Sequence, residues 1–196
     1  MSDHLHAGDL VYLGRPNNPT GITFAAAPLL EIVAAHPATW FAVDESFFEF
    51  IDGSSELITA TMPANLIVIR SLTKFYAIAG LRLGFAVASP ETASLLRHHV
   101  MPWTVNHLAQ AVGTVMLADN DYCAKSRLFA AERREELKGA LEEISGLKVF
   151  PGAANYLLVK LERSGLTARQ LADRLLISPD RQPLAIRVCD NYSGLD

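Results

Sequence analysis

Cysteine is scarce in this sequence, which contains Cys123 and Cys189 among 196 residues. Two cysteines do not make the dense disulfide framework of a small secreted protein, or the grouped thiolate ligands of a structural zinc site. We therefore expect both side chains to be reduced thiols in the core. The histidines that could be interpreted as metal ligands also lack acidic or cysteine partners at a useful spacing, so we predict no metal site. These histidines are His4, His6, His98 and His99.

Long hydrophobic runs are also missing. Half of the residues are hydrophobic and the mean hydropathy is +0.19, yet no stretch reaches the ~18 uninterrupted apolar residues of a membrane-spanning helix. The N-terminus has neither the basic start nor the apolar run of a signal peptide. We expect a cytoplasmic protein without a membrane partner. The high apolar content indicates either a large core or an apolar surface that a partner covers.

Basic clusters and a phosphate-binding glycine loop are missing as well. The net charge is −4, and the densest basic pair, Arg133 and Arg134, lies among glutamates, so nucleic acid is not an expected partner. Asp44 and Glu45 follow an apolar segment, as in the acidic motif of P-loop NTPases. That chemistry requires a Gly-x-x-x-x-Gly-Lys-Ser/Thr loop, which the sequence does not contain.

The sequence does contain apolar segments that alternate with helical patterns. Pro28 suits the first position of a helix that ends at His36, before a proline. Such alternation predicts an α/β fold, with a mostly parallel sheet flanked by helices. The predicted strands are 11–13, 40–43, 65–69 and 83–88, and further helices are predicted over 90–100 and 106–118.

The pattern changes after residue 120. A long charged helix is predicted over 121–144, with an apolar side formed by Leu128, Leu137, Leu141 and Ile144. A strand over 156–159, a helix over 168–176 and a last strand over 185–188 follow. We predict two domains: a partial large domain over 1–120, then an interdomain helix and a partial small α+β domain over 121–196.

Polar side chains follow the first three predicted strands. They are Asn18 after the first strand, Asp44 after the second, and Ser71 with Lys74 after the third. Ligands of open α/β sheets bind just beyond the carboxyl ends of the strands. Three separate segments therefore place polar groups at one edge of one sheet.

Lys74 and Arg82 are the candidates for chemistry within this group. A loop lysine usually faces solvent, but a lysine in a partly dry cleft can lose its proton and form a Schiff base with an aldehyde. Arg82 lies between Gly80 and Gly84, where its planar guanidinium suits a phosphate. Asp44 has plainer interpretations, as a helix cap or as one partner of a structural ion pair.

Four motifs in this order resemble the class I/II aminotransferases, the fold-type I pyridoxal-phosphate enzymes. They are NNPTG at 17–21, DE at 44–45, SLTK at 71–74 and GLRLG at 80–84. The resemblance implies pyridoxal 5'-phosphate as cofactor, with Lys74 forming its Schiff base and later shuttling protons. Asp44 would pair with the pyridinium nitrogen, Asn18 would hydrogen-bond the phenolic oxygen of the ring, and Ser71 and Arg82 would hold the cofactor phosphate.

Within this family the sequence is most similar to the threonine-phosphate decarboxylases, and next to the histidinol-phosphate aminotransferases. Many family members have a tyrosine three residues after the aspartate, whereas this sequence has Phe47, as in the decarboxylase branch. The resemblance implies a small phosphorylated amino acid as substrate. Arg187 would bind the substrate phosphate, or else is a surface arginine at a strand end, and Asn155 and Asn18 would line the same pocket. The segments that suggest the branch are 71–84, 101–106, 151–156 and 186–192.

Family members begin well upstream of Asn18 and continue past Asp196. The resemblance therefore implies that this chain is the middle and later part of an enzyme that forms a homodimer. In family members, the upstream part supplies a glycine-rich helix start that binds the cofactor phosphate and an aromatic residue that stacks on the cofactor ring. The downstream part supplies an arginine that binds the substrate carboxylate. Three activities stay open: decarboxylation of L-threonine O-3-phosphate to aminopropanol phosphate, transamination of histidinol phosphate or a related amino acid, and a catalytically inactive fragment.

Overall fold

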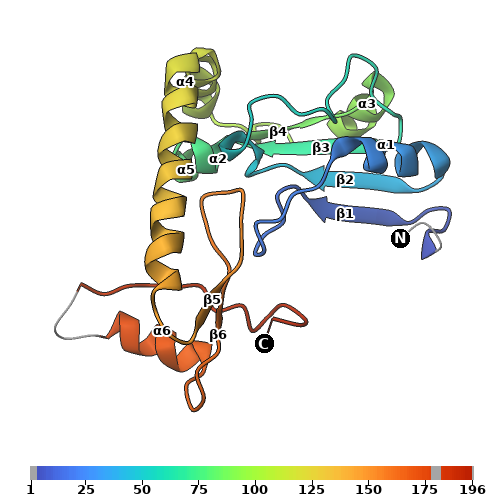
Figure 1. The fold of residues 1–196 in the computed structure, drawn as a ribbon. Helices are drawn as coiled ribbons and strands as arrows, with labels where there is room; N and C mark the ends of the chain where they lie inside the picture. The colour runs from blue at the N-terminus through green and yellow to red at the C-terminus, as the bar shows by residue number, and fades with distance from the viewer. Residues whose placement is uncertain (1–3, 178–181, 196) are drawn as a thin grey trace.

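A computed structural model of the chain describes residues 4–177 and 182–195 (Figure 1). It contains a four-stranded sheet, a two-stranded sheet and six α-helices among these residues. The first part comprises β1 (Leu10–Gly14), α1 (Ala26–Ala35), β2 (Trp40–Asp44), β3 (Leu66–Ser71), α2 (Leu72–Phe75), β4 (Gly84–Val87), α3 (Pro90–His99) and α4 (His107–Ala118). The second part comprises α5 (Asn120–Glu142), β5 (Leu147–Val149), β6 (Val159–Leu161) and α6 (Ala168–Leu176).

The four-stranded sheet follows the chain in the order β1-β2-β3-β4. β1, β2 and β3 are parallel, and β4 is antiparallel to β3. The prediction of a mostly parallel sheet flanked by helices is therefore confirmed. The register pairs Gly14 with Asp44 and Asp44 with Ile69, so the carboxyl ends of the three parallel strands lie at one edge.

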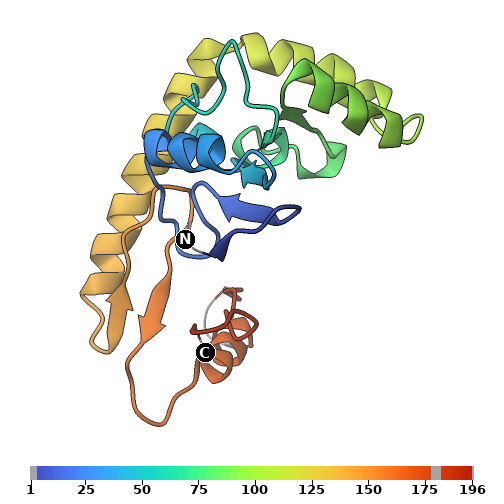
Figure 2. The ribbon, with the colours of Figure 1, turned by 90° about the vertical axis from the view of Figure 1, so that its right-hand side faces the viewer.

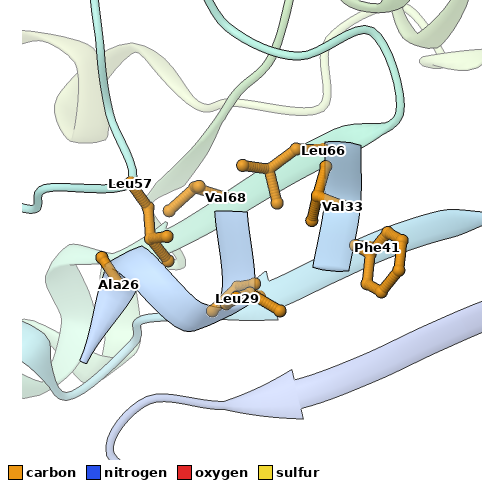
Figure 3. Close-up of a cluster of buried hydrophobic side chains, with 8 residues drawn as sticks. Ala26, Leu29, Val33, Phe41, Leu57, Leu66 and Val68 are labelled. Carbon is orange, nitrogen blue, oxygen red and sulfur yellow. The ribbon is translucent and has the colours of Figure 1, made fainter. Parts of the chain in front are cut away.

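The main core lies between α1 and the sheet, and Figure 3 shows its side chains. Leu29 and Val33 of α1 pack in one cluster with Phe41, Leu66 and Val68 of the central strands. Burial of these side chains is the main stabilising contribution to this half of the molecule. The edge strand is less covered, because Leu10 and Tyr12 are 65% and 60% exposed.

The C-terminus of α1 is fixed by a side chain from another segment. The helix spans Ala26–Ala35 and begins two residues before Pro28, so the predicted start was slightly late. His36 caps its C-terminus, where the helix was predicted to end. The buried amide of Asn65 donates to the backbone oxygens of Val33, His36 and Thr39, at 3.1, 3.0 and 2.9 Å. These bonds tie the end of α1 and the turn that follows it to the residue before β3.

α5 links the two parts of the molecule. In Figures 1 and 2 it runs alongside the large sheet and continues to β5 and β6. The predicted helix is confirmed, and three of the four residues that form its apolar side are largely exposed. Leu128, Leu137 and Ile144 are 62%, 52% and 52% exposed, because within the described part of the chain no element covers that side. The buried residue of α5 is Cys123 instead.

The second part differs from prediction in its strands. β5 was not predicted, and it pairs antiparallel with β6, which lies further along the chain than the predicted strand over 156–159. The predicted strand over 185–188 is wrong: these residues form no strand in the described structure. A strand requires a neighbour to accept and donate its backbone hydrogen bonds, and no described segment pairs with 185–188. α6 has the predicted bounds and begins with a capping box formed by Thr167 and Gln170.

Both cysteines are free thiols; Cys123 is buried and Cys189 half-buried. Across residues 4–177 and 182–195, none of the helices combines the length and the apolar character needed to cross a membrane.

Candidate active site

The carboxyl edge of the parallel strands brings together three of the predicted site residues. Asp44 ends β2, Ser71 ends β3, and Lys74 follows in the short helix α2. The positive charge of Lys74 is one of the influences that lower the pKa of Asp44, so the two groups interact across neighbouring strand ends. An amine and a carboxylate thus occupy the edge where open α/β sheets bind ligands.

The carboxylate of Asp44 is held by two hydrogen bonds. Its Oδ1 accepts from the backbone N–H of Ser46 at 2.9 Å, and its Oδ2 accepts from the hydroxyl of Tyr12 at 2.5 Å. Partial burial raises the pKa of Asp44, but hydrogen bonding with Ser46 and Tyr12 and the charge of Lys74 outweigh it, so the pKa lies below its ordinary value. Asp44 is therefore an anion at neutral pH.

The amine of Lys74 is accessible and has a weak polar anchor. Lys74 Nζ lies 3.4 Å from the hydroxyl of Ser71 and 5.6 Å from the centre of the Phe47 ring. Phe47 also meets the ring of Tyr156 edge-on, with centroids 5.0 Å apart. The amine can thus be reached from solvent while aromatic rings border it.

The predicted phosphate ligands lie where β3 ends and β4 begins: Ser71 is the last residue of β3, and Arg82 lies two residues before β4. The hydroxyls of Ser71 and Thr73 are 2.7 Å apart. Arg82 has a left-handed backbone (φ 54°), is exposed, and donates from Nη1 to the backbone oxygen of Ala79 at 3.0 Å. The ladder between Ser71 and Gly84 holds these two segments together. Two hydroxyls and a guanidinium thus lie on adjoining segments, with the guanidinium bound to its own loop.

Asn18 lies on a loop that is hydrogen-bonded to a segment far along the chain. Asn18 itself is exposed. The backbone N–H of Ala153 donates to the oxygen of Gly21 at 2.9 Å, and the hydroxyl of Tyr156 donates to the oxygen of Asn17 at 3.0 Å. The loop that carries Asn18 is therefore tied to residues more than a hundred positions later.

Tyr156 and Asn155 extend the site towards α5. With Lys74 they line an open cavity of about 600 Å³, whose α5 side includes Arg133 and Arg134. Burial and the negative charge of Asp44 raise the pKa of Tyr156 to about 12, and Tyr192 adds to this rise. Tyr156 is thus a neutral phenol near Asp44 over the physiological pH range.

Arg187 lies in the exposed segment after α6. Its Nη2 donates to Asn191 Oδ1 at 3.3 Å, and its guanidinium lies 5.7 Å from the centre of the Tyr192 ring. The negative charge that Tyr192 can carry contributes to the rise in the pKa of Tyr156. Within the described residues, Arg187 makes no hydrogen bond or ion pair with Lys74, Asn18 or Asn155.

Sequence reasoning missed a buried ionic cluster on the opposite side of the same strand ends. Glu45 accepts from Arg15 Nη1 at 2.9 Å and from Arg70 Nη1 at 3.0 Å, and all three side chains are at most 4% exposed. Ser55 donates to the same carboxylate at 2.7 Å, and Arg70 also bonds Glu49. The sequence does contain a sign of this cluster, because Arg15, Glu45 and Arg70 each lie at or next to a strand end. Because successive strand residues face opposite sides, Glu45 and Arg70 point away from Asp44 and Ser71.

Tyr12 was also missed, because the sequence places it in an apolar run. Its register partner is Ala42, and the pair Gly14 and Asp44 follows two residues later. Residues two positions apart face the same side of a sheet, so Tyr12 lies diagonally across from Asp44 on the site face. Only the pairing of β1 with β2 shows that Tyr12 lies close to Asp44.

No cluster of three His, Cys, Asp or Glu side chains suited to a metal ion occurs among the residues that the structure describes.

Fold and site together define an α/β protein with a lysine and a hydrogen-bonded aspartate at the carboxyl edge of its sheet. The sequence model of the family "Aminotransferase class I and II" matches residues 3–189. The chain belongs to this family, as its motifs predicted.

Three relatives illustrate the similarity. The chain is 39% identical over 193 residues to the threonine-phosphate decarboxylase of Salmonella typhimurium, covering 96% of this chain and 51% of that protein. A crystal structure of L-threonine-O-3-phosphate decarboxylase from Porphyromonas gingivalis matches with a TM-score of 0.83 and 26% identity, covering 99% and 59%. Histidinol-phosphate aminotransferase from Sinorhizobium meliloti, solved with pyridoxal-5'-phosphate, matches with a TM-score of 0.77 and 28% identity, covering 85% and 46%. The chain thus spans about half the length of these relatives.

Proposed function

We propose that this chain is part of a pyridoxal-phosphate-dependent enzyme that decarboxylates L-threonine O-3-phosphate to aminopropanol phosphate. The observation that carries the proposal is the interaction of an accessible Lys74 amine with an ionised Asp44 on neighbouring strand ends. The relatives that bear the decarboxylase name support the substrate. Phe47, which occupies the position of the usual family tyrosine, agrees with that branch.

The chemical character of the site residues fits pyridoxal phosphate. A primary amine can condense with its aldehyde, an anionic carboxylate suits its protonated ring nitrogen, and hydroxyl and guanidinium donors suit its phosphate. Lys74, Asp44, Ser71 and Arg82 would hold it, with Asn18 at the ring oxygen. When bound, the cofactor supplies an electron sink for negative charge that develops at the substrate Cα.

The residues of this chain then have distinct tasks. Asp44 carries a fixed negative charge, since its pKa lies below the ordinary value, and so stabilises a positive charge placed beside it. Lys74 Nζ is the nucleophile and the group that carries a proton to and from the reacting carbon. Phe47 and Tyr156 border the amine with aromatic surface, because Phe47 lies beside Lys74 Nζ and packs edge-on against Tyr156.

Arg187 and Asn155 are the proposed contacts for the substrate, together with Asn18. Arg187 supplies an exposed guanidinium that suits a phosphate, and Asn155 lines the cavity beside Lys74. A phosphate at one end and a carboxylate at the other orient an amino acid so that one bond to Cα is selected for cleavage.

Transamination of histidinol phosphate is the second candidate. Relatives that bear this name match over a similar length of the chain, for example at 31% identity over 190 residues in Methanothermobacter thermautotrophicus. Both reactions use the same lysine and aspartate, so the substrate contacts decide between them. A catalytically inactive fragment is the third candidate, because the chain spans about half of its relatives' length.

The first test is addition of pyridoxal phosphate to the purified chain. We expect a visible absorption band, and borohydride should fix the cofactor onto Lys74, as peptide mass analysis would establish. Lys74→Ala should lose both. Lys125→Ala is the matched control, since Lys125 lines the same cavity but pairs with Asp121 at 2.6 Å. A folded chain without a band contradicts cofactor binding by this chain.

The second test decides the reaction. Threonine phosphate should release CO2 in the presence of the cofactor, whereas histidinol phosphate with 2-oxoglutarate should give no amino transfer. The opposite result favours the aminotransferase. Binding of the cofactor with neither activity assigns the chain as a catalytically inactive fragment.

We also propose that the protein associates as a homodimer. Support comes from large apolar side chains exposed on α3, α4 and the loop between them, which include Leu95 at 61%, Met101 at 75%, Trp103 at 96% and Val115 at 71%. Apolar patches of this kind are uncommon on monomers. Sedimentation analysis tests the assembly.

A further inference from the structure

Tyr12 makes a hydrogen bond that none of the motifs contains. Its hydroxyl lies 2.5 Å from Asp44 Oδ2, and it reaches the carboxylate from β1, while Asp44 ends β2. The ring is 60% exposed, so it is not a core side chain. A side chain that packs little and makes one short bond to a site carboxylate acts mainly through that bond.

Tyr12 donates to the Asp44 carboxylate from another strand, whereas the other donor, Ser46, lies two residues after Asp44 in the chain. Oδ1 is occupied by the backbone N–H of Ser46. The titratable groups that face Asp44 are Tyr12 from β1, Lys74 from α2 and Tyr156 from the loop before β6. The phenol of Tyr156 donates instead to the backbone of Asn17.

Tyr12 is suited to donate and not to accept. Partial burial, the hydrogen bond to Asp44 and the negative charge of Asp44 together raise the pKa of Tyr12 to about 12. The phenol therefore keeps its proton at neutral pH. Hydrogen bonds from a neutral donor to a carboxylate are charge-assisted, and they stabilise the ionised form.

We propose that Tyr12 is a positioning residue: it fixes the orientation of the Asp44 carboxylate and keeps it ionised for a protonated ring nitrogen of the cofactor. Tyr12 does not touch the reacting atoms in this scheme and acts through Asp44. The inference rests on the proposed cofactor role of Asp44. The effect of Tyr12 on the orientation and the ionisation of the Asp44 carboxylate does not require the cofactor, and it can be tested on the chain alone.

The matched variant is Tyr12→Phe, which removes one oxygen and leaves the partly exposed ring in place. Two ligands separate a positioning role from a structural one. They are pyridoxal phosphate and its analogue with carbon in place of the ring nitrogen, which cannot pair with Asp44. We expect about tenfold weaker binding of pyridoxal phosphate, which corresponds to one charge-assisted hydrogen bond, and less than a twofold change for the analogue.

Two further variants complete this experiment. In an Asp44→Asn background, Tyr12→Phe should add almost nothing, because residues that act as a unit are not additive. Tyr122→Phe is the control for loss of a phenol, since Tyr122 donates to the backbone oxygen of Phe75 and not to Asp44. The proposal would be overturned if Tyr12→Phe bound both ligands equally more weakly, or if it bound both as tightly as the unaltered chain.

A second measurement does not need the cofactor. Titration of the Asp44 carboxyl carbon by NMR should show a higher pKa in Tyr12→Phe than in the unaltered chain. If the unaltered chain binds neither ligand, the proposed function fails, and this titration alone decides the role of Tyr12. An unchanged pKa of Asp44 then overturns it.

Discussion

Gly21 and Gly152 approach each other so closely that a Cβ atom on Gly21 would lie 2.8 Å from the Cα atom of Gly152. Gly21 belongs to the loop that carries Asn18, and Gly152 to the segment that carries Asn155 and Tyr156. This contact therefore packs the two segments of the candidate site against each other. The backbones can approach this closely only because Gly21 has no side chain.

Gly21→Ala should destabilise the chain by about 2 to 3 kcal/mol, because it combines a left-handed backbone (φ +71°) with a backbone clash. Urea unfolding measures the change. Gly165→Ala is the matched control, since Gly165 has φ +76° but open space around it. The control should cost about 1 kcal/mol. Equal losses for the two variants would mean that the clash contributes nothing.

Glu45→Gln should destabilise the chain by about 3 kcal/mol or more, because it removes the carboxylate that lies between two buried guanidinium groups. Glu56→Gln provides the comparison. Glu56 also pairs with Arg15, at 2.7 Å, but its side chain is 69% exposed, so its loss should cost at most about 1 kcal/mol. Chemical denaturation of both variants measures the difference, and similar losses would contradict the importance assigned to the buried cluster.

Stability should fall as the pH rises from about 10 to about 12, because the pKa of Tyr156 rises from 10.0 to about 12 in the folded chain. The folded state holds this proton more tightly than the unfolded state. The stabilisation is therefore complete below the unfolded pKa and is lost as the pH rises through the folded one. Tyr12 contributes in the same direction.

Tyr156→Phe should make this alkaline loss less steep, as urea midpoints across the pH window would show. At neutral pH the variant should lose about 1 kcal/mol, because the bond to the oxygen of Asn17 is removed. An unchanged slope would mean that Tyr156 titrates alike in both states.

Leu57→Ala should cost about 2 to 5 kcal/mol, because Leu57 is fully buried in the main core (Figure 3). Leu128→Ala on α5 should cost less than about 1 kcal/mol, since Leu128 is 62% exposed. Thermal or urea unfolding compares the two. A large loss at Leu128 would show that a surface covers this side of α5 in solution, as the apolar pattern of the helix predicted.

Local pattern predicted most of the elements well. Buried strands appear in the sequence as apolar segments that end in Asp44 and Ser71, and α6 begins at a capping box that its residues specify. The boundaries of the second part were less predictable. A short strand such as β5 depends on pairing with β6 and not on its own three residues, and 185–188 has a strand-like composition without a partner.

The sequence by itself determined the order of strands and helices and the chemistry at the strand ends: Lys74, Asp44 and Ser71 follow buried strands, and parallel strands share one carboxyl edge. The tertiary structure decided which groups meet across the chain. Tyr12 reaches Asp44 over 32 positions, and Tyr156 reaches Asn17 over 139. Such contacts depend on strand register and on the packing of distant loops, and neither is encoded in the periodicity of a single segment.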